Sequence, residues 1–148
     1  METLMDLMYA RRTIREFTDE AVTDEQVEAM LSKREMLDRL AQVHKYAHWL
    51  EEAPLAIVVC GDQDLSEKHW VEDTCVATQN LLLAATALGL GGVWISLYPK
   101  KKHQRYVRER LEIPNHLGVL CALAVGNPAE EKPPRTKYHP SRVHWEEW

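Results

Sequence analysis

The chain has 148 residues, of which 45% are hydrophobic and 28% charged, and this length is typical of one domain. The composition excludes collagen-like, low-complexity and disordered proteins. The formal net charge is −5, so the chain has no overall positive field that would attract nucleic acid or anionic lipid. We therefore expect a single domain over residues 1–148 with neither a nucleic-acid nor a membrane partner.

The cysteines and the apolar segments indicate a cytoplasmic protein. Cys60, Cys75 and Cys121 lie far apart in apolar stretches, which excludes a disulfide framework and a spaced zinc site. Residues 1–15 lack the unbroken apolar run of a signal peptide. Residues 74–99 carry no charge, but three glycines interrupt them, so a helix followed by a strand is favoured over a membrane span.

The first third of the chain is predicted to be helical. Apolar residues recur there at helical spacing, and Thr23 begins a capping box with acids in the first turn. Pro54 ends this region. The predicted helical segments are residues 2–10, a helix from about Asp24, residues 33–43 and a short turn over residues 46–52.

Strands and helices alternate in the rest of the chain. Continuous apolar runs predict buried strands, and amphipathic segments between them predict helices, the first capped by Gly89. The predicted elements are a strand over 55–60, a helix over 70–88, a strand over 93–97, a helix over 100–112 and a strand over 119–125. This order indicates helices on both faces of a sheet.

Residues 129–148 are rich in proline, charge and aromatic side chains. Tyr138, Trp145 and Trp148 lie there outside any predicted core element. Large aromatic side chains of this kind are often covered by a partner chain. We therefore expect a dimer in which this C-terminal extension packs on the partner subunit.

A basic run, Arg11-Arg12-Thr13-Ile14-Arg15, is the most informative cluster of polar residues. Closely spaced guanidinium groups and a hydroxyl can clamp a phosphate or a polar heterocycle through charge-assisted hydrogen bonds. The same run could instead be a solvated turn with surface ion pairs to Glu16, Asp19 or Glu20. The residues alone leave both interpretations open.

Three long segments resemble the FMN-dependent nitroreductase family. They are YARRTIREFTDEAVTDEQVEAML over residues 9–31, HWVEDTCVATQNLLLAATALGLGGVWISLYP over 69–99 and LEIPNHLGVLCALAVGNPAEEKPPRTKY over 111–138. Thr13 stands where the family usually has Ser, and Ala21 where Pro is common. The resemblance implies an α+β fold, a three-layer α/β/α sandwich around a mixed, mainly antiparallel sheet.

The resemblance also implies a function. Members of this family are homodimers that bind two FMN groups at the subunit interface and pass a hydride from NADH or NADPH through flavin N5 to an acceptor. The acceptor is a small molecule such as a nitroaromatic or a quinone. The cofactor supplies the redox chemistry, so we name no catalytic side chain and no metal ligand.

The residues that the resemblance assigns to FMN come from three regions. Arg11 and Thr13 would meet phosphate or ribityl oxygens, Arg12 would contribute its backbone, and Arg15 would meet the pyrimidine edge. An N–H of Ser96 or Leu97 would meet N5 or O4, although plain core packing is the alternative for Trp94 and Ile95. The complete set is Arg11, Arg12, Thr13, Arg15, Trp94, Ile95, Ser96 and Leu97, with the late cations Arg135 and Lys137 and, as a competing assignment, Lys132.

One departure from the family falls between Leu31 and Ser32. Family members carry a further stretch there of roughly twenty residues, a Pro-Ser-x-x-Asn-x-Gln-Pro-Trp type loop and a buried strand. Neither is present here. The loop's Ser and Asn contact FMN in the family, so an apparent internal deletion at 31–32 would remove one strand and part of the site. The alternative function is a non-catalytic dimeric relative, a scaffold or flavin carrier that has lost full cofactor binding.

Two other clusters carry weaker signals. His44 and His48 are four residues apart and could share a helical face, but no acidic partner follows them as in a zinc protease. The basic segment from Lys100 to Arg110 is typical of a solvated helix, with contact to the phosphate of a nicotinamide donor as the alternative.

Overall fold

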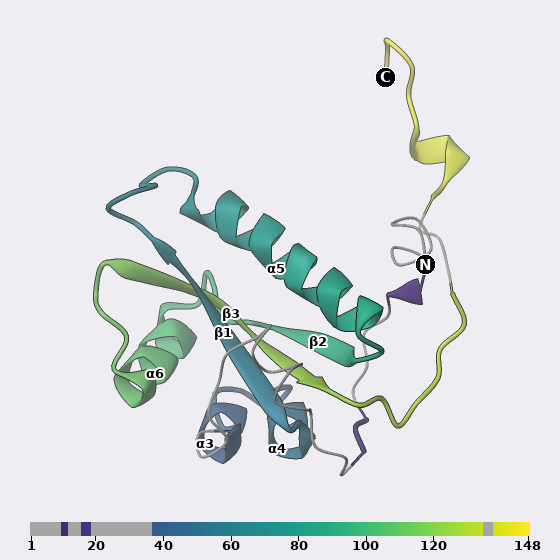
Figure 1. Cartoon of the computed structure of the whole chain (residues 1–148). Coiled ribbons are helices and arrows are strands. Elements are labelled where there is room, and N and C mark those ends of the chain that lie inside the picture. Colours follow the sequence, from purple (N-terminus) through teal and green to yellow (C-terminus); the bar gives the residue numbers. More distant parts are fainter. Residues whose placement is uncertain (1–9, 12–15, 19–36, 135–137) are drawn as a thin grey trace.

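The computed structural model describes residues 10–11, 16–18, 37–134 and 138–148 (Figure 1). The helix predicted from about Asp24 and the junction at Leu31 and Ser32 lie outside the described residues, as does all but the last residue of the helix predicted over 2–10. The elements are α3 (Leu37–Ala41), α4 (Trp49–Glu52), β1 (Leu55–Asp62), α5 (Trp70–Ala87), β2 (Gly91–Ser96), α6 (Lys101–Leu111), β3 (Leu117–Gly126) and the short 3-10 helix η2 (Pro140–Arg142).

The three strands form an antiparallel sheet in the order β1-β3-β2. The central strand β3 is buried from Gly118 to Gly126, as its unbroken apolar sequence predicts. Leu55 of β1 pairs with Val125, and Gly91 of β2 pairs with Gly126. The three predicted strands are therefore confirmed, and both strand pairs in the described part of the chain are antiparallel.

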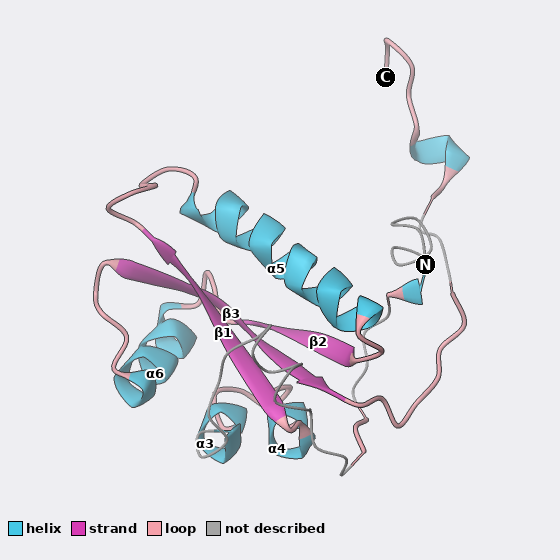
Figure 2. Ribbon diagram, viewed as in Figure 1, coloured by secondary structure: helices cyan, strands magenta, loops and turns pink. Residues whose placement is uncertain are grey.

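Helices cover both faces of the sheet, which confirms the three-layer α+β arrangement. Figure 2 shows α5 on one face and α3, α4 and α6 on the other. Each face has its own apolar cluster. Trp70 and Leu82 of α5 pack on one side of the sheet, while Leu50 of α4 and Val107 of α6 pack on the other.

The turn after α5 positions strand β2. Gly89 adopts a φ of 75°, a conformation that glycine accepts at low cost and that commonly ends a helix. The N–H of Leu90 then donates to the carbonyl of Ala85 at 2.8 Å. This hydrogen bond confirms the predicted glycine cap, and β2 begins at the next residue, Gly91.

Two segments that are distant in the sequence, residues 16–18 and 127–129, meet at one corner of the sheet. Phe17 forms an isolated antiparallel bridge with Pro128, supported by hydrogen bonds from the Thr18 N–H to Asn127 and from the Ala129 N–H to Glu16, both 2.9 Å. Beyond this bridge the C-terminal segment leads away from the sheet (Figure 1). None of the helices in the described part of the chain has the length and apolarity needed to cross a bilayer.

Candidate functional site

The outer edge of β2 exposes backbone hydrogen-bonding groups. Ser96 lies opposite Cys121 in the ladder, and the N–H of Leu97 donates to the carbonyl of Leu120 at 3.1 Å. Backbone groups of successive residues in a strand point to opposite sides. The N–H and C=O of Ser96 therefore point away from β3, toward the side of β2 where the described residues form no further strand.

This geometry decides between the two backbone donors that the sequence left open. Leu97 is fully buried and its N–H is already used within the sheet. Ser96 is exposed at the end of β2. Of the two, Ser96 is the residue whose N–H can meet a ligand beside the strand.

His44, in the loop between α3 and α4, lies at this same edge. Its Nδ1 accepts a hydrogen bond from the N–H of Tyr46 at 3.1 Å, and its ring also hydrogen-bonds the backbone of Ser96. Because Nδ1 is an acceptor, we assign the ring proton to Nε2, which donates to the Ser96 carbonyl. The α3–α4 loop is thereby held against β2.

A cavity of about 450 Å³ lies between the α3–α4 loop, β2 and the start of α6. This volume is within the range of about 300–1,000 Å³ that is usual for small-molecule sites. Among the described residues, its lining combines aromatic rings with basic side chains and includes no carboxylate. The lining residues are His44, Lys45, Tyr46, Trp49, Trp94, Ile95, Ser96, Lys100 and His103.

Two imidazole rings lie side by side in the cavity wall. The ring centroids of His44 and His103 are 5.0 Å apart with a tilt of 35° between the planes. Burial lowers the pKa of both side chains; for His44 the neighbouring His103 and Lys100 lower it further, and for His103 the ammonium groups of Lys100 and Lys102 do so. Both rings are therefore uncharged at neutral pH.

One polar atom of this wall is buried without a partner. The Nδ1 of His103 is shielded from solvent and has no hydrogen bond to any described residue. Buried polar atoms are nearly always hydrogen-bonded, so this nitrogen is an exception within the described part of the chain.

The structure brings some of the predicted FMN residues to this cavity and leaves others elsewhere. Trp94, Ile95 and Ser96 line it, whereas Leu97 lies behind it in the core, and neither Arg11 nor Lys132 is among the lining residues. The predicted residues Arg12, Thr13, Arg15, Arg135 and Lys137 lie outside the described part of the chain.

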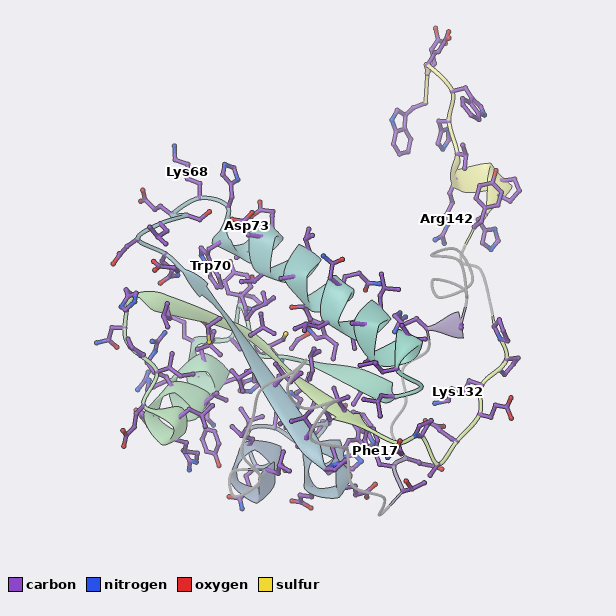
Figure 3. All side chains as sticks on the ribbon, in the orientation of Figure 1. Phe17, Lys68, Trp70, Asp73, Lys132 and Arg142 are labelled. Atoms are coloured by element: carbon purple, nitrogen blue, oxygen red, sulfur yellow. The ribbon has the colours of Figure 1, made fainter. Side chains whose placement is uncertain are left out.

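Lys132 lies at the corner where the chain leaves the sheet. Its ammonium forms an ion pair with Glu130 at 2.5 Å. Figure 3 shows Lys132 and Phe17 on the same side of the molecule, with Trp70 and Asp73 at the far end of α5. The Phe17–Pro128 bridge thus places residues 16–18, just after the basic run, beside the segment that continues to Lys132.

Contacts in the structure decide how two weaker sequence signals are interpreted, the His44 and His48 pair and the basic segment from Lys100 to Arg110. His44 faces the cavity, whereas His48 is exposed and packs on Trp49 with a ring centroid distance of 4.5 Å. These histidines therefore do not converge as a metal pair. In the basic helix, Arg108 is structural because its guanidinium donates to the carbonyls of Ile113, Pro114 and Leu117.

The sequence suggests His44 only as half of a weak metal pair and Lys100 only as part of a basic segment that could meet a donor's phosphate; it does not predict that they line one cavity with Tyr46, Trp49 and His103. His44, Tyr46 and Trp49 come from one segment, and Lys100 and His103 follow about fifty positions later. Each of these residues is polar or aromatic and lies next to apolar residues that recur at helical spacing. Such spacing predicts which face of a helix is buried, but it does not predict which distant segments come into contact.

Comparisons with known proteins agree with this architecture. Residues 31–127 match the family model described as "Nitroreductase family". A provisionally named NADH dehydrogenase/NAD(P)H nitroreductase from Archaeoglobus fulgidus is 33% identical over 174 aligned positions, covering 100% of both chains. These aligned positions exceed the 148 residues of this chain by 26.

Solved structures give the same result. A provisionally named NADH dehydrogenase/NAD(P)H nitroreductase from Parabacteroides distasonis superposes with a TM-score of 0.93 at 30% identity, over 100% of each chain. A provisionally named nitroreductase in complex with FMN, from Desulfovibrio desulfuricans, superposes with a TM-score of 0.81 at 26% identity, over 99% of this chain and 98% of that one.

Proposed function

Because the chain belongs to the nitroreductase family, we propose that it is an FMN-dependent oxidoreductase that takes electrons from NADH or NADPH. Its acceptor is a small molecule such as a nitroaromatic or a quinone. The names of the relatives support the activity, and the FMN-bound structural neighbour supports the cofactor. The three free thiols fit a reducing cytoplasm as its place of action.

The observation that carries this proposal is the outer edge of β2, along which the described residues place no further strand. The Ser96 N–H points outward there, beside a cavity with an indole in its wall. An isoalloxazine ring is planar and has hydrogen-bond acceptors along one edge. The residues present therefore fit a flavin that lies along β2, with the Ser96 N–H as its donor.

FMN, when bound, supplies the hydride chemistry by accepting two electrons from the nicotinamide and giving them to the acceptor. The protein's part is to hold and orient the reactants. The Ser96 N–H fixes the ring edge, and Trp94 offers an apolar surface beside it. The His44 ring donates a hydrogen bond to the Ser96 carbonyl, so the Ser96 N–H is the backbone group of this residue that remains for the ligand.

We further propose that the phosphate is held away from this cavity by cations from both ends of the chain. Arg11, Thr13 and Arg15, with the backbone of Arg12, would act together with Arg135 and Lys137, with Lys132 as the competing cation. The Phe17–Pro128 bridge supports this arrangement because it joins the segments next to both groups. Guanidinium groups are well suited to phosphate.

The protein would work as a homodimer, and the C-terminal extension over residues 129–148 would pack on the partner. Trp145 and Trp148 are 84% and 103% exposed in the single chain, which supports burial by a second copy. The 26 extra aligned positions support a segment missing from this chain, which we place between Leu31 and Ser32 from the resemblance described above. That shortening keeps the non-catalytic flavin carrier or scaffold as the second candidate.

Cofactor retention tests the proposal directly. The purified protein should be yellow, keep flavin through gel filtration at the mass of a dimer, and oxidise NADH or NADPH when an acceptor is added. Arg11→Ala combined with Arg135→Ala should release the flavin, and Lys68→Gln, at an exposed lysine of the loop before α5, is the matched control. A colourless dimer that ignores added FMN would favour the scaffold.

A further inference from the structure

We propose that His44 is a positioning residue for the flavin site: its neutral ring fixes the outer edge of β2 at Ser96, and a second proton on the ring releases this edge and weakens flavin binding. The part that concerns flavin rests on the oxidoreductase function proposed above. The coupling between the His44 ring, its own loop and β2 depends only on contacts within the chain.

The first argument is that His44 completes the hydrogen bonding of the peptide group between Ser96 and Leu97. The N–H of this group donates to the carbonyl of Leu120 at 3.1 Å, on the inner side of β2. Its carbonyl accepts a hydrogen bond from the His44 ring on the outer side. The group is therefore held from both sides, and this fixes the direction of the adjacent Ser96 N–H, the proposed donor to the flavin.

The second argument is that the His44 ring uses both of its nitrogens. Nδ1 accepts a hydrogen bond from the N–H of Tyr46 at 3.1 Å, so the proton of the neutral ring is assigned to Nε2, which faces the Ser96 carbonyl. A second proton has only Nδ1 to bind. It removes the acceptor of the Tyr46 N–H and sets two donors against each other. Protonation therefore opens the turn that carries the ring.

The third argument is the charge around the ring. The ring of His103 lies beside it, with the two centroids 5.0 Å apart. The described residues place cations and no carboxylate next to these two imidazoles. A second proton on His44 therefore finds no counter-charge there and adds to the repulsion. The groups that face the two rings are Lys45 and Tyr46 from the loop, the Ser96 carbonyl from β2, and Lys100, Lys102 and His103 from the start of α6.

These surroundings determine the direction of the pH effect. Burial, His103 and Lys100 lower the pKa of His44 while the loop lies on β2, and the Ser96 carbonyl acts in the opposite direction. A histidine ring that has moved into solvent has an ordinary pKa of about 6.5. The released state therefore binds the proton more tightly, so a fall in pH below about 6.5 favours release.

A purely structural role for His44 is the alternative. In that case the loss of the ring would destabilise the fold but would not change how the affinity for FMN depends on pH. Glutamine separates the two roles, because its amide can donate a hydrogen bond to the Ser96 carbonyl but takes up no proton in this pH range. Alanine provides neither property.

The experiment measures the affinity of the purified protein for FMN between about pH 7.5 and about pH 5.5, from the change in flavin fluorescence on binding. Far-UV circular dichroism of the same samples shows that the protein stays folded. Over this range the parent should lose about threefold or more affinity relative to His44→Gln. The FMN phosphate itself titrates at about pH 6, but this contribution is common to all variants.

Two further variants complete the series. His44→Ala should bind FMN about tenfold more weakly than the parent already at neutral pH, and His44→Gln should restore most of this loss. His48→Gln is the matched control, at an exposed histidine of the same loop, and should keep the parent's pH profile. The same pH profile in the parent and His44→Gln, or equal affinity of the parent and His44→Ala at neutral pH, would overturn the proposal.

A measurement without flavin separates this inference from the proposed function. Amide hydrogen exchange of Tyr46, followed by NMR and corrected for the intrinsic effect of pH, should show loss of protection in acid. Constant protection would also overturn the proposal. Protein that binds FMN with a pH profile independent of position 44 refutes only the present inference. Protein that never binds FMN but loses Tyr46 protection in acid refutes the oxidoreductase and keeps the coupling of the ring to its loop.

Discussion

The indole of Trp70 lies against the backbone of Gly118, so closely that a Cβ at position 118 would be 2.7 Å from the Cη2 and Cζ3 atoms of the ring. Trp70 begins α5, and Gly118 lies near the start of the central strand. The absence of a side chain at 118 therefore sets how closely this helix can approach the sheet.

Gly118→Ala should destabilise the protein by about 1–3 kcal/mol, because the indole is rigid and the helix must move to admit the methyl group. Urea unfolding followed by far-UV circular dichroism measures the change. Gly92→Ala is the matched control, since the one close contact of its Cβ would be with the end of the Leu82 side chain, at 2.9 Å, while Ala124 and Val125 would lie at the ordinary distances of 3.6 and 3.8 Å. An equal loss in both variants would show that Trp70 is not the obstacle.

Ser96→Pro tests the backbone donor of the proposed flavin site. Proline removes the N–H that points outward while leaving the ladder bond of Leu97 in place, and edge strands tolerate proline on their open side. The variant should fold but retain about tenfold less flavin than the parent. Ser96→Ala keeps the N–H and should retain normal flavin content. Loss of flavin in the alanine variant as well would assign the contact to the hydroxyl instead.

Acid should weaken the fold through His44. Its pKa is lowered in the folded state, chiefly by burial and then by His103 and Lys100. The unfolded chain therefore binds more protons, so the free energy of unfolding falls as the pH drops below about 6.5 and levels off below the folded pKa. Urea midpoints between about pH 7.5 and about pH 5 measure this loss. His44→Gln should reduce the pH dependence, with His103 contributing the remainder, whereas His139→Gln, in the exposed C-terminal segment, should leave it unchanged.

Cys121 should resist alkylation in the folded protein. Burial raises the pKa of this thiol to about 12, although its hydrogen bond with the Thr78 hydroxyl acts in the opposite direction. Iodoacetamide reacts with thiolates, so Cys121 should stay unlabelled at about pH 8.5. Peptide mass spectrometry after native and denaturing labelling measures this, with all three cysteines modified in guanidinium. Complete native labelling of Cys121 would show that the sheet opens readily around Thr78.

The fold follows well from local patterns in the second half of the chain. The apolar run at 119–125 is continuous because β3 is buried on both faces, and Gly89 ends α5 where a left-handed residue is needed. The run at 55–60 also forms a strand, but its residues 57–60 are only half-buried. These features can be predicted from residues that are adjacent in the sequence. The strand order β1-β3-β2 cannot, because it depends on contacts between strands that are far apart in the sequence.

Only the wall of the cavity formed by β2 could be predicted from the sequence. The resemblance predicts a ligand beside Trp94, Ile95 and Ser96, and the structure places these residues in the cavity wall. His44 and His103 were not identified as a pair, because a loop and a helix start from distant parts of the chain bring their rings together. The choice of Ser96 over Leu97 likewise needed the strand register, which side-chain patterning does not provide.

The bridge between Phe17 and Pro128 has a mechanical consequence. Because it joins segments close to both ends of the chain, tension applied at the termini would load its two hydrogen bonds before it reaches the ladder of β3. Stretching a tethered molecule should therefore give an early, weak rupture that frees the terminal segments, followed by a separate and stronger event when the sheet yields.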